Sequence, residues 1–189
     1  DDEDRENEGD FVCAAESVTT ETINFMLQGH GQLCAPVLPS VCQRLELRPL
    51  VDHNTSPLTT AFMTPVDHAG CKTGITAGER AETIRRLASE NSKPSDFVKP
   101  GHVYPLLAME GGVLRRAGHT EAAVDLARMA GLTPAGVLCE ILNHEGDRAT
   151  RDELLDLAEK HGLEIITVEQ IISHRRISEK LVNRTAKAK

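Results

Sequence analysis

Apolar residues in the first half of the chain fall into two kinds of pattern. Ile23, Met26 and Leu27 follow the i, i+3, i+4 spacing of one helix face, and Thr19 before them is a suitable N-cap. Short continuous apolar runs are instead typical of buried strands. The first half therefore predicts strands over residues 11–15, 33–38 and 58–66 and helices over residues 19–29, 40–45 and 76–88.

The second half repeats these signals, and capping boxes mark where its helices begin. A threonine followed three residues later by Glu or Gln occurs at Thr76, Thr150 and Thr167. Gly111-Gly112 predicts a turn, and polar loops are predicted over residues 51–57, 67–74 and 91–101. The remaining pattern predicts strands over residues 104–108, 136–142 and 164–167 and helices over residues 120–130, 150–162 and 167–176.

Strands and helices interleave without a strict βα repeat, which favours an α+β fold. We expect a single domain with a mixed β-sheet, covered by helices in a layered αβα arrangement. The domain is predicted to span residues 1–176. The stretch from 175 to 189 carries six basic residues and one acid, so residues 177–189 are predicted to be a basic tail or linker.

Composition excludes several classes of protein. The net charge of −8 and an aromatic content of 3% without tryptophan argue against a nucleic-acid partner. No apolar run approaches the roughly 20 residues that a membrane span requires. The five cysteines form no CxxC pair, which argues against a zinc ribbon and favours free thiols in the cytoplasm.

The first ten residues, DDEDRENEGD, hold seven carboxylates and one arginine. Charges packed this closely repel one another unless water or a cation surrounds them, and Mg²⁺ and similar hard ions prefer carboxylate oxygen. The alternative is a frayed acidic tail. Two features favour a site: Gly9 leads directly into the apolar run at 11–15, and Arg5 is suited to bind phosphate or carboxylate.

A second candidate site is the string from Arg115 to Thr120, which reads RRAGHT. Thr120 at a predicted helix start, with Gly118 and Arg116 close by, would form a cradle for phosphate. The alternative is a capped helix with a surface arginine pair. His119 is expected to be exposed at the helix mouth, as a ligand would be.

Glu140 and His102 are the remaining candidates for acid–base chemistry. Glu140 lies inside an apolar strand, where an unpaired carboxylate is costly, so it is either a functional acid or base or faces solvent from an edge strand. His102 follows Pro100-Gly101 and is otherwise a hydrogen-bonded turn histidine.

Three further sets of residues are weaker candidates for a functional site. Cys34 is expected to be a buried thiol. Asp67 and His68 are adjacent in a strand and point to opposite faces, so a structural role is expected. Thr73, with its neighbours, could supply donors to a phosphate.

Four strings together carry a resemblance to a known family: DDEDRENEGD, TGITAGERAETI, KPGHVYPL and GGVLRRAGHTEAAVDLARMAGLTPAGVLCEI. From Asp1 to about Arg176 the chain resembles the 3,4-dihydroxy-2-butanone 4-phosphate synthases of riboflavin biosynthesis. The resemblance implies a homodimeric lyase that converts D-ribulose 5-phosphate to L-3,4-dihydroxy-2-butanone 4-phosphate and formate, through a metal-stabilised enediolate, dehydration and skeletal rearrangement. It also implies Mg²⁺ or Mn²⁺, with two ions per active site when substrate is bound.

The resemblance assigns roles to residues of this chain. The implied metal ligands are Glu6 and His119. The residues implied in catalysis are His102, Glu140, Asp10 and Glu8, and either Glu140 or Asp10 is the base that removes the C3 proton. The residues implied in substrate binding are Arg5, Glu6, Asp10, Cys34, Thr73, Arg116, Ala117, Gly118, His119, Thr120 and Glu140.

The chain departs from the family at both ends. Members carry a helix and a strand before the acidic loop, which are expected to be absent here. The string SEKLVNRTAKAK resembles the linker to a GTP cyclohydrolase II domain in bifunctional relatives. Two alternatives remain open: a non-catalytic homologue that binds metal and sugar phosphate or serves as a dimerisation module, and another metal-dependent sugar-phosphate enzyme such as an isomerase or aldolase.

Overall fold

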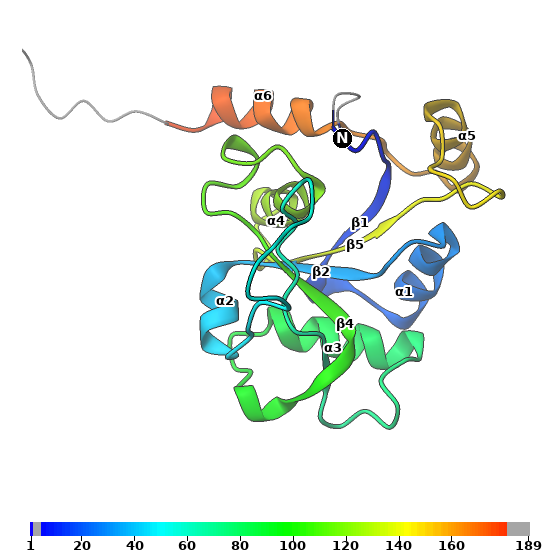
Figure 1. Cartoon of the computed structure of the whole chain (residues 1–189). Coiled ribbons are helices and arrows are strands. Elements are labelled where there is room, and N and C mark those ends of the chain that lie inside the picture. The colour runs from blue at the N-terminus through cyan, green and yellow to red at the C-terminus, as the bar shows by residue number, and fades with distance from the viewer. Residues whose placement is uncertain (2–4, 181–189) are drawn as a thin grey trace, which may run out of the picture.

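The computed structural model describes residue 1 and residues 5–180. Five strands form one sheet in the order β1-β5-β2-β4-β3, with helices on both faces (Figure 1). The strands are β1 (Asp10–Ala14), β2 (Cys34–Val37), β3 (Val66–His68), β4 (Phe97–Leu107) and β5 (Gly136–Glu140). The helices are α1 (Thr20–Met26), α2 (Pro39–Arg44), α3 (Ala77–Ala88), α4 (His119–Met129), α5 (Arg151–His161) and α6 (Val168–Ser178).

The sheet is mixed, as predicted. β2 and β4 are parallel, whereas the β1–β5, β5–β2 and β4–β3 pairs are antiparallel. The sheet therefore has one parallel pair at its centre and belongs to the α+β class.

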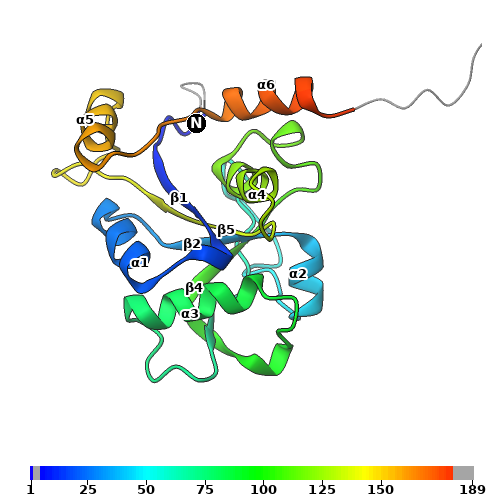
Figure 2. The same ribbon diagram turned by 180° about the vertical axis from the view of Figure 1, so that it is seen from behind.

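Strand alternation sends side chains into two layers. Val137 and Cys139 point into the main core, which α1 and α3 cover, while Leu138 packs with Cys34 on the opposite face. α4 covers part of that opposite face, where a Cβ placed on Gly136 would lie 2.7 Å from the Ala123 Cβ. Figure 2 shows α3 and α4 on opposite sides of the strands, in the expected αβα arrangement.

Four helix starts lie where the capping threonines predict them. The Thr76, Thr150 and Thr167 hydroxyls each accept a hydrogen bond from the backbone N–H three residues on, and the box is completed by the side chain at that position. The Thr19 side chain caps α1 in the same way, by accepting from Thr22 N at 3.1 Å. These caps satisfy backbone donors that the helix itself leaves unpaired.

The predicted strand at 58–66 is wrong. Residues 58–65 form only isolated bridges, such as Phe62 with Leu106, and Thr59 adopts a left-handed φ of 54° that breaks an extended run. The strand begins only at Val66, so the predicted 67–74 loop is shortened by Asp67 and His68.

Two further boundaries are also wrong. The predicted loop at 91–101 ends early, because β4 begins at Phe97 and pairs with β3 through a bulge. Pro100 is tolerated near that irregularity because a bulge leaves a backbone position without a ladder bond. Residues 164–167 form no strand and simply connect α5 to α6.

The C-terminal basic stretch is partly ordered. Arg175, assigned from sequence to that solvated stretch, is only 5% exposed and its Nη1 donates to Asp125 Oδ2 at 2.7 Å. The same nitrogen donates to Gly111 O, so α6 is fastened to the turn before α4. Of the predicted tail at 177–189, residues 181–189 lie outside the described residues. Within the described part of the chain, no helix is long and apolar enough to cross a membrane.

Candidate active site

The site begins with a cross-strand pair at the end of the β1–β5 ladder. Asp10 and Glu140 are paired in register, so both side chains project from the same face of the sheet. That face is the one that Leu138 shares, as the predicted alternation requires. The ladder therefore places two of the predicted catalytic carboxylates next to each other.

His119 is brought to this pair by α4. It is the first residue of α4, and its Nδ1 lies 3.5 Å from Asp10 Oδ2 and 3.7 Å from Glu6 Oε2. The imidazole is only 13% exposed, so the predicted exposure at the helix mouth is wrong. The N-cap is Gly118 rather than Thr120, which lies buried in the first turn.

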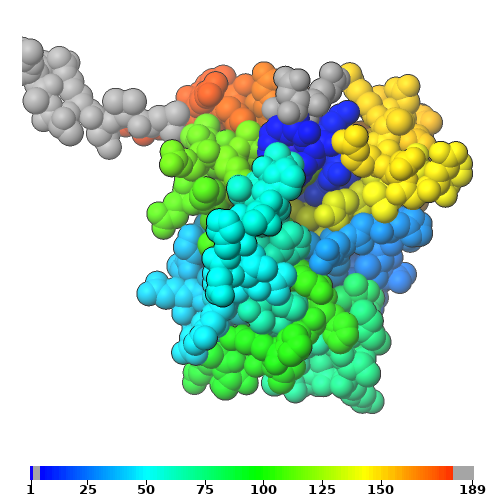
Figure 3. Space-filling model, in the orientation of Figure 1, coloured from blue at the N-terminus to red at the C-terminus, as the bar shows by residue number. Residues whose placement is uncertain are grey.

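Several contacts anchor the acidic segment, which favours the site over the frayed-tail interpretation for residues 5–10. Arg5 Nη1 donates to Ala117 O and to Asp1 Oδ2, and Arg148 Nη1 donates to Glu6 O. Figure 3 shows the N-terminal segment, in blue, seated at the surface between the loop before β3 (cyan) and the segment after β5 (yellow).

Crowding of carboxylates perturbs their ionisation. Burial raises the pKa of Asp10 to about 7, and the Glu140 and Glu8 charges add to that rise. Burial also raises the pKa of Glu8. The hydrogen bond to His119 instead lowers the pKa of Glu6. Glu6 is therefore held ionised, while Asp10 can carry a proton near neutral pH.

The cluster fits a divalent cation. Asp1, Glu6 and His119 offer ligand atoms that all lie within 4.8 Å of one another. Asp10 Oδ1 is buried without a hydrogen-bond partner among the described residues, which is costly unless a ligand meets it. Carboxylate oxygens with one imidazole nitrogen are ligands that suit Mg²⁺ or Mn²⁺.

In the segment 115–120, which was predicted to bind phosphate, Arg116 forms an ion pair with Glu121 that the sequence did not suggest. Arg116 Nη1 donates at 2.8 Å to Glu121, whose side chain is 1% exposed, and Nη2 donates to Leu58 O and Thr60 Oγ1. Arg116 is therefore held between the loop before β3 and the first turn of α4.

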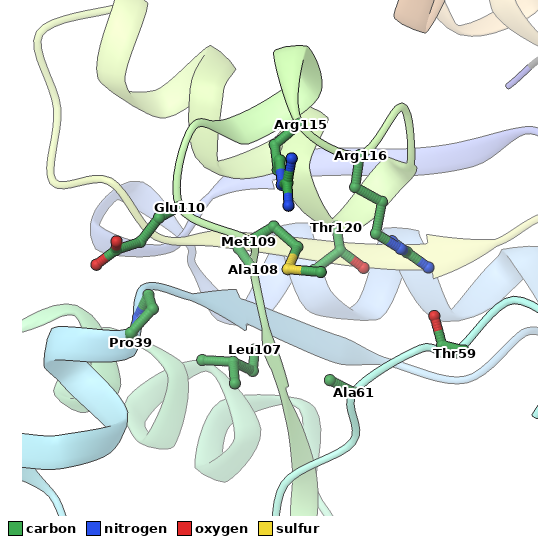
Figure 4. Close-up of a pocket in the computed structure, with 10 residues that line it drawn as sticks. All are labelled: Pro39, Thr59, Ala61, Leu107, Ala108, Met109, Glu110, Arg115, Arg116 and Thr120. Carbon is green, nitrogen blue, oxygen red and sulfur yellow. The ribbon is translucent and has the colours of Figure 1, made fainter. Parts of the chain in front are cut away.

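A cavity of about 320 Å³ opens next to this segment (Figure 4). Arg116 and Thr120 line it from around the start of α4, Thr59 lines it from the loop before β3, and Leu107 and Met109 line it at the end of β4. None of the predicted acids or histidines lines this cavity. The cavity therefore borders the segment 115–120 but is separate from the cluster of predicted catalytic acids and histidines.

Two other predicted site residues lie near β3. His102 is hydrogen-bonded to Asp67, with Nδ1 2.7 Å from Oδ2. Thr73 donates through its backbone N–H and its hydroxyl to Glu79, which holds the loop before α3. Among the described residues, neither His102 nor Thr73 has a hydrogen bond to the acidic cluster.

β2 lies between the two strands that carry Glu140 and His102. It begins at Cys34, which pairs with Leu138 of β5 on one side and with Tyr104 of β4 on the other. The Gln32 N–H donates to Glu140 Oε2 at 2.7 Å.

Cys34 is the first residue of β2. It is 1% exposed, and burial raises the pKa of its thiol well above the usual range, with the Glu140 charge adding to the rise. It is therefore the buried, inert thiol that the sequence predicted.

Sequence reasoning missed several residues of the site. Asp67 was assigned a structural role, and Glu121, Gln32 and Arg148 were not singled out. One signal was available: Glu121 and Asp125 lie four residues apart among alanines, which predicts two carboxylates on a buried helix face.

These features define an α+β protein whose carboxylates and histidines gather at one edge of a mixed sheet around a candidate site for a divalent cation. Residues 1–174 match the family model of 3,4-dihydroxy-2-butanone 4-phosphate synthase. The chain belongs to this family. It is 54% identical over 185 residues to riboflavin biosynthesis protein RibBA of Bacillus mycoides, covering 97% of this chain and 47% of the relative. The chain spans about half the length of the curated relatives it matches.

Solved structures agree with this assignment. A two-domain 3,4-dihydroxy-2-butanone 4-phosphate synthase from A. baumannii, RibBX, is 48% identical with a TM-score of 0.91, covering 95% of this chain and 53% of that one. A 3,4-dihydroxy-2-butanone 4-phosphate synthase in complex with two magnesium ions is 40% identical with a TM-score of 0.85, covering 94% of this chain and 88% of that one.

Proposed function

We propose that this chain converts D-ribulose 5-phosphate to L-3,4-dihydroxy-2-butanone 4-phosphate and formate. The observation that carries the proposal, alongside family membership, is the convergence of Glu6 and Asp10 on His119, with Glu140 opposite Asp10. A site of this composition can bind a cation and move protons, which is what the reaction requires. A non-catalytic homologue is not favoured, because these residues and His102 are all present.

Glu6 and His119 would hold the cation, with Asp1 within reach of the same point. When bound, a divalent ion would supply Lewis-acid stabilisation of negative charge on the substrate oxygens. We propose Mg²⁺ or Mn²⁺, with two ions per site when substrate is bound. The relative with two magnesium ions supports this proposal.

We assign removal of the C3 proton to Glu140. The side chain of Asp10 is only 3% exposed, whereas Glu140 is half-buried and so more accessible to a substrate. The Gln32 N–H donates to Glu140 Oε2 at 2.7 Å and so helps to hold the carboxylate in place. Asp10, with its raised pKa, is suited to give a proton to the departing hydroxyl, and Glu8 lies beside it.

Substrate binding is assigned to the two ends of the site. Arg5, Glu6 and Asp10 contact the sugar end, and the string from Arg116 to Thr120 binds the phosphate end. The positive end of α4 and its unpaired backbone N–H groups support the second assignment. Cys34 and Thr73 are proposed to border the site.

Assembly and location are also proposals. We infer a homodimer in the cytoplasm, and the free state of all five cysteines is compatible with a reducing compartment. A GTP cyclohydrolase II domain after this chain stays a prediction, supported by relatives about twice as long. Light scattering on the purified chain tests the dimer.

The deciding experiment is formate release from ribulose 5-phosphate, measured with Mg²⁺ and then with EDTA. We expect formate in equal amount to substrate consumed, together with a four-carbon ketone phosphate, and no formate with EDTA. Consumption of substrate without formate would identify an isomerase or aldolase instead. Binding without consumption would indicate a non-catalytic homologue.

A further inference from the structure

Both carboxylate oxygens of Asp67 contact the same residue, His102. Its Oδ1 accepts a hydrogen bond from the backbone N–H of His102 at 2.9 Å, and its Oδ2 lies 2.7 Å from His102 Nδ1. Asp67 is 5% exposed, while the side chain of His102 is 43% exposed. The pair therefore consists of a buried carboxylate beneath an accessible imidazole.

The backbone packs closely around Asp67 and restricts its carboxylate. Gly74 approaches with a left-handed φ of 85°, and a Cβ on it would lie 2.0 Å from Asp67 Oδ2. A Cβ on Gly101 would lie 2.0 Å from the carbonyl carbon of Val66. The loop that carries Gly74 is itself fixed, because Glu79 accepts hydrogen bonds from its backbone.

This geometry determines which imidazole nitrogen carries the proton. An ionised carboxylate only accepts hydrogen bonds, so His102 Nδ1 must be the protonated nitrogen of the neutral ring. Nε2 then presents a lone pair. Because the ring is accessible, that lone pair can accept a proton from a bound molecule.

We propose that Asp67 is the positioning residue for His102, holding its imidazole in the Nδ1–H tautomer with Nε2 available to the substrate. This inference rests on the proposed function, in which His102 assists the proton transfers that follow removal of the C3 proton. Asp67 acts only through His102 and does not touch the substrate.

The test is Asp67→Asn. The Asn oxygen can still accept from the His102 backbone N–H, which turns its NH₂ group toward Nδ1 and forces the proton onto Nε2. We expect kcat to fall about 10³-fold with KM within a few-fold, as for a triad histidine held in the wrong tautomer. ¹⁵N NMR of the imidazole should show the protonated nitrogen switch from Nδ1 to Nε2.

Two readouts separate positioning from a general structural defect. Mg²⁺ binding, followed as thermal stabilisation, depends on Glu6 and His119 and should be unchanged in Asp67→Asn. Asp52→Asn, at an exposed position, serves as the matched control and should leave kcat and the His102 tautomer as in the wild type.

A wild-type His102 protonated on Nε2 would overturn the proposal without any variant, and so would an Asp67→Asn enzyme with kcat within threefold of the wild type. If the wild type released no formate at all, the proposed function would fall. The tautomer in the wild type would then still decide whether Asp67 orients His102.

Discussion

Asp10 and Glu140 face each other across β1 and β5, and only Asp10 is sealed from solvent. This difference between two opposed carboxylates separates their roles. The more accessible one can reach a substrate, and the buried one holds a proton near neutral pH. The pair thus supplies a base and an acid from one step of a β-ladder.

Replacing Glu140 by Gln should remove the base without disturbing the fold, because the Gln oxygen can still accept from the Gln32 N–H. We expect formate release to fall about 10³-fold. Exchange of the substrate C3 proton with solvent, followed by NMR, should fall in parallel. Normal exchange in Glu140→Gln would exclude this residue as the base, and Glu145→Gln, at an exposed position, is the control.

Asp10 should make the metal-free protein less stable as pH rises from about 4 to about 7. Its pKa is raised from 3.8 to about 7, so in this interval the folded protein keeps a proton that the unfolded chain loses. The contribution is complete below pH 4, is lost through pH 7, and amounts to at most about 4 kcal/mol. Thermal unfolding in EDTA should show a flatter pH dependence for Asp10→Asn than for wild type. An identical slope in both proteins would contradict the prediction.

Metal binding should stabilise the fold through Glu6 and His119. A cation that binds only the folded state at 100 times its Kd adds about 2.7 kcal/mol to the free energy of unfolding. Addition of Mg²⁺ should therefore raise the Tm of the wild type, and Glu6→Gln or His119→Gln should abolish the rise. Glu46→Gln, at an exposed position away from the cluster, should respond as the wild type does.

Gly31 should be intolerant of a side chain for a reason specific to the site. A Cβ at this position would lie 2.3 Å from Glu140 O and 2.7 Å from Glu140 Oε2. Gly31→Ala must therefore displace the proposed base, and we expect kcat to fall at least 10²-fold, as for a misplaced catalytic group. Gly78→Ala in α3, where the nearest atom to the added Cβ is Thr20 Oγ1 of α1 at 3.3 Å, is the control and should keep full activity.

Arg175 should be important for stability. Its Nη1 pairs with Asp125, which is 1% exposed and also accepts from Val113 N at 2.8 Å. Arg175→Met leaves that carboxylate with only the more exposed Arg128, 3.6 Å away, as a charged partner, and should cost about 3–5 kcal/mol in urea unfolding. The double variant with Asp125→Asn should recover part of the loss, because no buried charge then remains. Arg176→Met, at the exposed neighbour, should change little.

The sequence predicts well the features whose causes are local. A threonine and the glutamate three residues later form their cap within one helical turn, so the start of α3 follows from Thr76 and Glu79 alone. Alternation likewise places Glu140 and Leu138 on the same face of β5. The acidic segment and the string ending at Thr120 were found because their residue types are unusual where they occur.

Features that depend on pairing between distant segments could not be predicted. The Asp67–His102 contact requires β3 and β4 to pair through a bulge, and nothing near Asp67 in the sequence specifies that register. The strand expected at 58–66 failed because Thr59 adopts a left-handed φ of 54° and only short bridges, such as Phe62 with Leu106, join this segment to β4. Arg116 was expected to be free for phosphate, but the fold brings it onto Glu121 and the backbone of Leu58.

β1 is an edge strand, paired only with β5 in the described sheet. Edge strands are among the first elements to open in hydrogen exchange, well below the free energy of global unfolding. Opening of β1 would draw Glu6 and Asp10 away from His119 together. The lifetime of the assembled site is then set by how often this one strand detaches. A cation that joins Glu6 to His119 should therefore slow amide hydrogen exchange in β1 more than in β2.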